Sequence, residues 1–217
     1  MKRTRVFILS IASMGLVAAV GAGASQEPPS QSAQAVVGDA VTALDLEEVV
    51  GTFAERINRG LAIAPVPLNF GGKDALLIGL GSYIVNAQGG CNDCHTNPPY
   101  AAGGNPFLGQ REKINAAGYL AGGTAFGPFV SRNLTPRANG RPANLTFEQF
   151  RIIMRTGTDL KHRAPFVPSA QRDILQVMPW PVFSHMRLID LRAIYEYLSA
   201  IPSRPTPAAP TPNSSQP

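Results

Sequence analysis

Hydrophobic residues recur at helical spacing in four stretches of the chain, with polar residues on the opposite faces. The spacing predicts helices over residues 46–57, from 74 to the glycines at 89 and 90, over 146–157 and over about 187–200. Between these stretches no hydrophobic run alternates over a convincing length, so strands should be few. The pattern therefore predicts an all-α fold with long irregular loops.

Local signals mark several helix ends. Pro65 and Pro67 should stop the first helix. Thr146 and Gln149 have the spacing of a capping box, and Gly157 is suited to the end of the same helix. The last helix opens at Arg187 without a good Ser, Thr or Asp cap, so its start is less defined.

The first residues have the composition of a secretory signal. Lys2, Arg3 and Arg5 precede the apolar run 6–20, and small residues follow at 22–24. This order predicts an exported chain whose signal peptide is removed. The apolar run is shorter than the roughly 20 residues that span a bilayer, so a retained anchor is the weaker alternative.

Composition divides the rest of the chain into segments. The Gln-, Ser- and Pro-rich leader and the Pro-rich C-terminal tail contain too few large hydrophobic residues to offset their ordering entropy. The expected organisation is as follows: signal peptide 1–24, flexible leader 25–43, N-terminal helix and connection 44–72, main helical domain 73–202, disordered tail 203–217.

The number and distribution of charged residues bear on whether the chain binds nucleic acid. Removal of the three basic residues of the signal lowers the formal charge from +5 to +2. The remaining cations form no stripe and are not interleaved with aromatic residues, so the sequence does not indicate a nucleic-acid-binding protein.

Cys91, Cys94 and His95 form the motif that carries the most specific chemistry, Cys-Asn-Asp-Cys-His. Two thiols on one turn can form thioethers with the two vinyl groups of a haem, and the following imidazole can ligate the iron. A simple disulfide would close only a tiny loop. A thioredoxin-like dithiol and a zinc site are weaker alternatives, because no βαβ pattern and no convincing set of four ligands is present.

The second axial ligand has five candidates: Met154, Met178, Met186, His162 and His185. Met154 lies on the apolar face of a predicted helix and is interpreted as a core residue. Met178 precedes a proline in an irregular stretch before the last helix, which suits a ligand laid across the haem, so we expect Met178. His/Met ligation leaves no vacant position for a substrate and favours electron transfer.

Several motifs occur in a specific order over about residues 74–202: Gly81–Val85, Gly89–Thr96, Ser131–Pro136, Phe150–Gly157 and Met178–Leu198. This order resembles class I c-type cytochromes, most closely those that partner periplasmic dehydrogenases. Residues 73–202 are accordingly expected to be a cytochrome c domain. Arg137 stands where the family usually has an acid, and Leu145 where it often has tryptophan.

The resemblance implies a cytochrome c-like helical wrap around one haem, with the helix at 44–72 as an extra element. It implies Met178 as the distal ligand and a close crossing of the domain's first and last helices. Gly79 or Gly81 would permit that crossing against Tyr195 or Leu198.

Supporting roles around the haem are also expected from the sequence. A backbone carbonyl should accept the proximal imidazole N–H, and Pro106 is the candidate. Trp180, Tyr83 and Phe126 are candidates for packing on the ring edge, with plain core as the alternative. Asn133, Thr135 and Arg132 are candidates for binding a propionate, with a solvated loop as the alternative.

The expected function is that of a periplasmic electron carrier with one haem c, and not of an enzyme. Its expected partners are a dehydrogenase or cytochrome as donor and an oxidase or cytochrome as acceptor. Membrane association is expected only if the signal segment is retained. A haem peroxidase or gas-binding cytochrome with an open sixth position remains an alternative, as does a fixed subunit of a larger dehydrogenase.

Overall fold

A computed structural model of the chain describes residues 46–160 and 174–207, with side chains from residue 51 onward. These residues are mostly helical, with one small antiparallel sheet. The α-helices are α2 (Leu46–Ile63), α3 (Ala75–Tyr83), α4 (Cys91–His95), α5 (Phe147–Thr156), α6 (Trp180–Phe183) and α7 (Leu188–Ala200). The other elements are the π-helical turn η1 (Ile84–Gln88), the 3₁₀ turn η2 (Pro106–Leu108) and the strands β1 (Ala125–Phe126) and β2 (Phe129–Val130).

The four predicted helices are all present, and their caps explain their bounds. Asp74 caps α3, because its Oδ1 accepts from the amide of Leu76 at 2.9 Å. The capping box of Thr146 and Gln149 is formed at the start of α5. Gly157 ends α5 with a φ of 68°, a conformation that favours glycine. α2 is longer than the apolar spacing suggested and ends at Ile63, shortly before the prolines.

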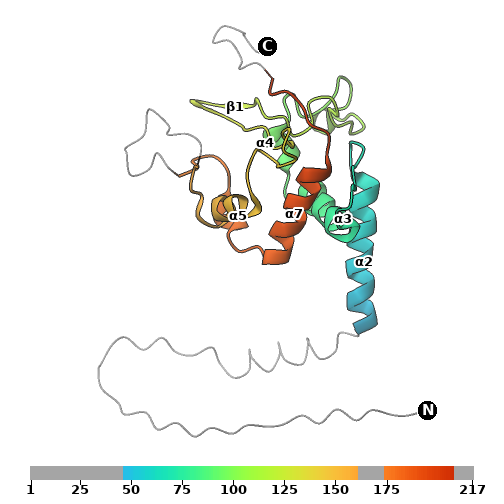
Figure 1. The fold of residues 1–217 in the computed structure, drawn as a ribbon. Helices are drawn as coiled ribbons and strands as arrows, with labels where there is room; N and C mark the ends of the chain where they lie inside the picture. The colour runs from blue at the N-terminus through green and yellow to red at the C-terminus, as the bar shows by residue number, and fades with distance from the viewer. Residues whose placement is uncertain (1–45, 161–173, 208–217) are drawn as a thin grey trace, which may run out of the picture. The chain divides into compact units, whose positions relative to one another are not determined.

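Glycines permit α3 to pack closely between α2 and α7 (Figure 1). A Cβ at Gly81 would clash with the backbone of Ala193 in α7, and one at Gly60 would clash with the backbone of Gly79 in α3. The crossing expected at Gly79 or Gly81 is therefore found at Gly81, which faces α7. Gly79 faces α2 instead. The atoms nearest to a Cβ at Gly81 belong to Ala193 and Tyr197, whereas Tyr195 or Leu198 was expected.

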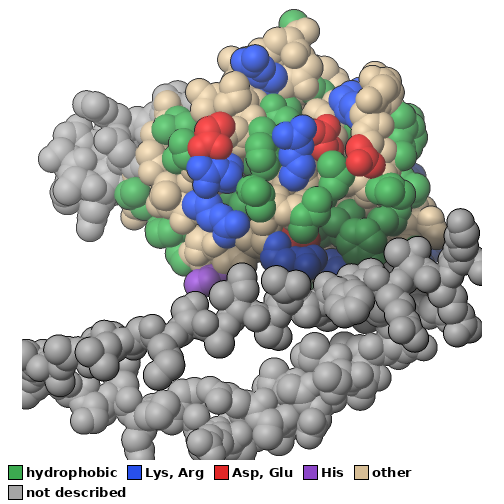
Figure 2. Space-filling model, turned by 60° about the horizontal axis from the view of Figure 1, so that its bottom comes forward, with side chains coloured by type: hydrophobic (Ala, Val, Ile, Leu, Met, Phe, Trp, Pro, Cys, Tyr) green, Lys and Arg blue, Asp and Glu red, His purple; other side chains and the backbone are tan. Residues whose placement is uncertain are grey.

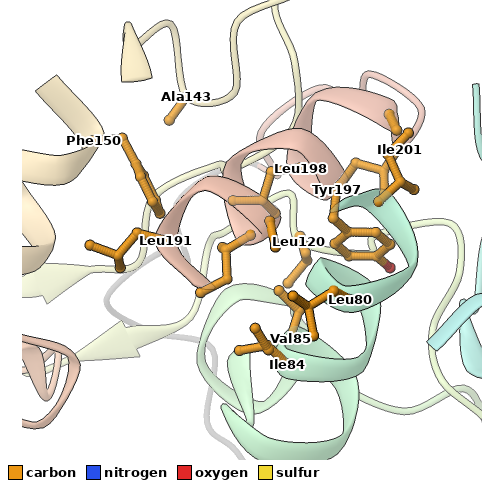
Figure 3. Close-up of a cluster of buried hydrophobic side chains, with 14 of the residues drawn as sticks. Leu80, Ile84, Val85, Leu120, Ala143, Phe150, Leu191, Tyr197, Leu198 and Ile201 are labelled. Carbon is orange, nitrogen blue, oxygen red and sulfur yellow. The ribbon is translucent and has the colours of Figure 1, made fainter. Parts of the chain in front are cut away.

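The core is formed where α3, η1, α5 and α7 meet (Figure 3). The side chains of Leu80, Leu120 and Leu191 are fully buried there. Met154 is also buried, which confirms its interpretation as a core residue. On the outside of α3, α2 buries Ile57, so the N-terminal helix covers part of the core.

The start of the C-terminal tail differs from expectation. The backbone carbonyl of Arg204 accepts from the side-chain amide of Asn133 at 2.8 Å, and its amide donates to the hydroxyl of Thr135 at 3.1 Å. Pro207 lies against Gly123. Residues 203–207 are thus hydrogen-bonded and packed on the loop at 122–135, although their composition suggested disorder. The expected signal, leader and remaining tail lie outside the described residues.

The surface carries charges of both signs, as Figure 2 shows for one face. Neighbouring residues on α5 and α7 pair with one another, for example Arg151 with Glu148 and Arg192 with Glu196. These helices therefore neutralise much of their own charge. Within the described part of the chain, no helix is both long and apolar enough to cross a bilayer.

Candidate functional site

One helical turn, α4, presents the three residues of the cysteine–histidine motif. Gly90, with a φ of 57°, redirects the chain from η1 into α4. Cys94 and His95 follow Cys91 by three and four residues, so all three side chains lie on one face of the turn. The chain leaves α4 in an extended conformation at Thr96.

The exit from α4 is held by hydrogen bonds to the loop at 118–123. The hydroxyl of Thr96 is fully buried and accepts from the amide of Leu120 at 2.9 Å. The amide of Gly122 donates to the carbonyl of His95 at 2.7 Å. A segment more than twenty residues away therefore fixes the orientation of the turn.

Both cysteines are free thiols with different surroundings. Cys91 packs against the hydrophobic core, and burial, with a smaller contribution from Cys94, raises the pKa of its thiol to about 12. Partial burial and the neighbouring Asp93 also raise the pKa of Cys94. Neither thiol has the lowered pKa typical of dithiol redox sites.

The half-buried imidazole of His95 is oriented by a backbone carbonyl. Its Nδ1 lies 2.8 Å from the carbonyl oxygen of Arg132, 37 residues along the chain. When the proton of the neutral ring is on Nδ1, this N–H donates to the carbonyl, and the lone pair of Nε2 remains free. Burial lowers the pKa of His95, against the opposing effect of the Arg132 carbonyl, and the Arg132 charge lowers it further. The neutral imidazole is thus favoured.

The expectation that Pro106 supplies this carbonyl is wrong. Pro106 begins η2, and its carbonyl accepts from the amide of Gly109 at 3.0 Å. Arg132 takes the role because the loop after β2 returns beside α4. No local sequence signal indicates such a long-range backbone contact.

The three residues considered for a propionate have protein partners. Arg132 forms an ion pair with Asp159. The side-chain oxygen of Asn133 accepts from both the amide and the hydroxyl of Thr135, at 2.8 and 2.7 Å, while its amide binds the carbonyl of Arg204. In the structure these side chains tie segments of the chain together.

Met178 lies in the irregular segment before α6, as expected. Its half-buried side chain packs against the same hydrophobic core as Cys91. The segment is anchored where the amide of Leu175 donates to the carbonyl of Gly157 at 2.8 Å. Met186 is also half-buried against the core, His185 is exposed, and His162 lies outside the described residues.

The aromatic candidates for the ring edge have other contacts. Trp180 lies over Gly157 and donates from Nε1 to the carbonyl of Leu175 at 3.2 Å. The ring of Tyr83 lies under the guanidinium of Arg56 at 5.2 Å. Phe126 belongs to the small sheet, where it pairs with Phe129. Each of them therefore has a structural role.

A buried polar network lies beside the motif, and no motif in the sequence indicates it. The hydroxyls of Tyr119 and Tyr197 are 2.9 Å apart, and Asn86 of η1 accepts from Tyr119 at 2.5 Å and donates to Tyr197 at 3.1 Å. Burial raises the pKa of both tyrosines, and the charge of a Cys91 thiolate would raise it further, because the network lies close to that sulfur. The network joins η1, α7 and the loop at 118–123.

In comparisons with known proteins, no family model, curated protein sequence or solved structure matches the chain. Among the described residues, no group of three or more His, Cys, Asp and Glu side chains is arranged to hold a metal ion.

Proposed function

We propose that this chain is an electron-transfer protein that carries one haem c, attached through Cys91 and Cys94 and ligated by His95. The observation that carries the proposal is the arrangement of α4. Two free thiols and an imidazole lie on one face of a single turn, and the Nδ1 of His95 is tied to the carbonyl of Arg132. Nε2 is thereby available for an axial bond.

These residues fit the proposed group, because both thiols are unpaired and the imidazole is neutral and oriented. The haem would supply an iron that alternates between the ferrous and ferric states. His95 would hold the iron from one side, with its ring kept in place by Arg132. Met178 would be the second ligand of the iron. Its thioether would favour ferrous iron and so raise the reduction potential.

The fold supports a cytochrome c-like wrap of residues 73–202 around this group. α3, which leads through η1 into the motif, crosses α7 at Gly81 with backbones in close approach. Residues 96–143 are mostly irregular and rich in glycine, and a prosthetic group would give them a surface to pack on. The extra helix α2 covers the outer side of α3.

The proposed role is that of a carrier or electron-transfer subunit, and not of an enzyme. With both His95 and Met178 bound to the iron, no coordination position would remain for a substrate, so the haem would supply electron exchange alone. Residues 1–24 support export to the periplasm, where c-type haem proteins exchange electrons with dehydrogenases, other cytochromes and oxidases. A partner that co-purifies from the native host would identify a fixed subunit.

Covalent attachment is the first test. The chain is produced with its signal in a bacterial host that has the c-type haem maturation system, then unfolded and extracted with acidic acetone. We expect the pigment to stay with the polypeptide and to give the pyridine haemochrome spectrum of a c-type haem. The variant Cys91→Ala/Cys94→Ala should lose its covalent pigment, whereas His185→Ala, at an exposed histidine, should keep it.

Two outcomes would contradict parts of the proposal. Complete release of the pigment, or a correctly matured chain without any, would show that no haem c is attached. Ready binding of carbon monoxide by the reduced protein would exclude a bound Met178 and would favour a peroxidase or gas-binding protein.

A further inference from the structure

The carbonyl that orients His95 belongs to a residue whose side chain is itself held. One nitrogen of the Arg132 guanidinium, Nη2, lies 2.5 and 2.6 Å from the two carboxylate oxygens of Asp159. The two side chains are 27% and 12% exposed. Since solvent screens such a pair only weakly, the interaction is stronger than that of an ordinary surface ion pair.

The position of Asp159 connects two parts of the proposed haem site. It follows α5, next to Thr158, which forms an isolated antiparallel bridge with Ile174. From Ile174 the chain runs directly to Met178. The ion pair therefore links the loop that orients the proximal ligand to the base of the segment that carries the proposed distal ligand.

We propose that Arg132 and Asp159 are a positioning pair that sets the reduction potential of the haem. This inference rests on the proposed function. Asp159 holds the side chain of Arg132, so that the backbone carbonyl of Arg132 keeps the orientation of His95. The carboxylate of Asp159 also neutralises the guanidinium of Arg132, which lies close to His95. The site gains a fixed hydrogen-bond acceptor without gaining a net positive charge.

The two charges act on the iron with opposite signs. Ferric haem carries one more positive charge than ferrous haem, so a nearby cation disfavours the ferric state and raises the potential, and an anion lowers it. Asp159→Asn removes the negative charge beside the guanidinium, and Arg132→Gln removes the positive charge beside the carboxylate. Neither substitution removes the carbonyl that His95 uses, because this belongs to the backbone.

The experiment compares the reduction potentials of the haem-loaded wild type and variants by spectroelectrochemical titration. We expect Asp159→Asn to raise the potential and Arg132→Gln to lower it, each by about tenfold in the electron-exchange equilibrium constant, or ~59 mV. The double variant should return close to the wild type. Arg132→Lys, which keeps the charge, should shift the potential less than Arg132→Gln.

The exposed pair Arg151 and Glu148 on α5 provides the matched control, and Glu148→Gln should leave the potential nearly unchanged. The ferric thioether band of each variant shows whether the distal ligand has been lost. Shifts of the same sign in both single variants, or shifts no larger than that of Glu148→Gln, would overturn the inference. A wild-type chain without covalent haem would instead refute the proposed function and, with it, this inference.

Discussion

Tyr119 and Tyr197 place two hydroxyls 2.9 Å apart in the buried interior, beside the first cysteine of the motif. Asn86 satisfies both, and Ser82 extends the network by donating to the carbonyl of Gly60 in α2 at 2.6 Å. Such a network is stable only while its members remain hydrogen-bonded and neutral. Burial raises the pKa of both tyrosines, so the folded state retains their protons.

The free energy of unfolding should therefore depend on alkaline pH. Below the ordinary tyrosine pKa of about 10 both states are protonated, and the stabilisation is complete. Above it the unfolded chain loses protons that the folded chain keeps, so stability falls as pH rises. We expect urea midpoints measured from pH 8 to 11 to fall less steeply in Tyr119→Phe/Tyr197→Phe. Equal slopes in variant and wild type would contradict this.

The proposed distal ligand is also a single side chain, that of Met178. Met178 and Met186 are both half-buried against the core, which makes them a matched pair. In Met178→Ala the weak red charge-transfer band of a thioether on ferric iron should vanish, and the reduction potential should fall. In Met186→Ala the band should persist. A band that survives Met178→Ala would assign the ligand elsewhere.

At the scale of elements, the packing of α3 against its two neighbouring helices depends on glycines. Gly81 brings the backbones of α3 and α7 together, and Gly60 with Gly79 does the same for α2 and α3. This stacking orients η1 and therefore the start of α4. The motif is thus positioned by a helix pair to which it does not itself belong.

Gly81→Ala should destabilise the fold by about 1–3 kcal/mol or more, because the added Cβ would overlap the backbone of Ala193. Gly51→Ala is the matched control within α2, where nothing lies within 4 Å of the added Cβ. It should stabilise the helix by about 0.5–1 kcal/mol. Urea unfolding followed by circular dichroism measures both. Similar effects of the two substitutions would argue against the crossing.

At the scale of the whole molecule, segments far apart in sequence hold the cysteine–histidine motif in place. The segment 203–207 packs on the loop at 122–135, which in turn carries the carbonyl bound by His95. The last described residues of the chain therefore support the loop that orients the proposed proximal ligand. This connection explains why a proline-rich segment is hydrogen-bonded there.

A chain that ends at Pro202 should be less stable by about 1–3 kcal/mol, because Asn133 and Thr135 would lose the backbone of Arg204 as partner. A chain that ends at Pro207 keeps these contacts and should unfold like the full chain. Thermal unfolding distinguishes them. Equal stability of the two truncated chains would show that the contacts contribute nothing.

The sequence by itself determined the features that depend on neighbours along the chain. Helix periodicity, the capping box at Thr146 and the glycine at the end of α5 were all predictable, because these interactions span only a few residues. The same holds for the common face of Cys91 and His95 on one turn. The close crossing of α3 and α7 was implied by the family resemblance, and a glycine in α3 permits it.

Only the tertiary structure decided which distant groups meet. Arg132 replaced Pro106 as the partner of His95, and Ala193 is the residue that Gly81 approaches. The tyrosine network and the packed segment at 203–207 likewise join residues separated by many positions. Such contacts depend on how loops close around the core, and a backbone carbonyl, which every residue has, leaves no signature in the sequence.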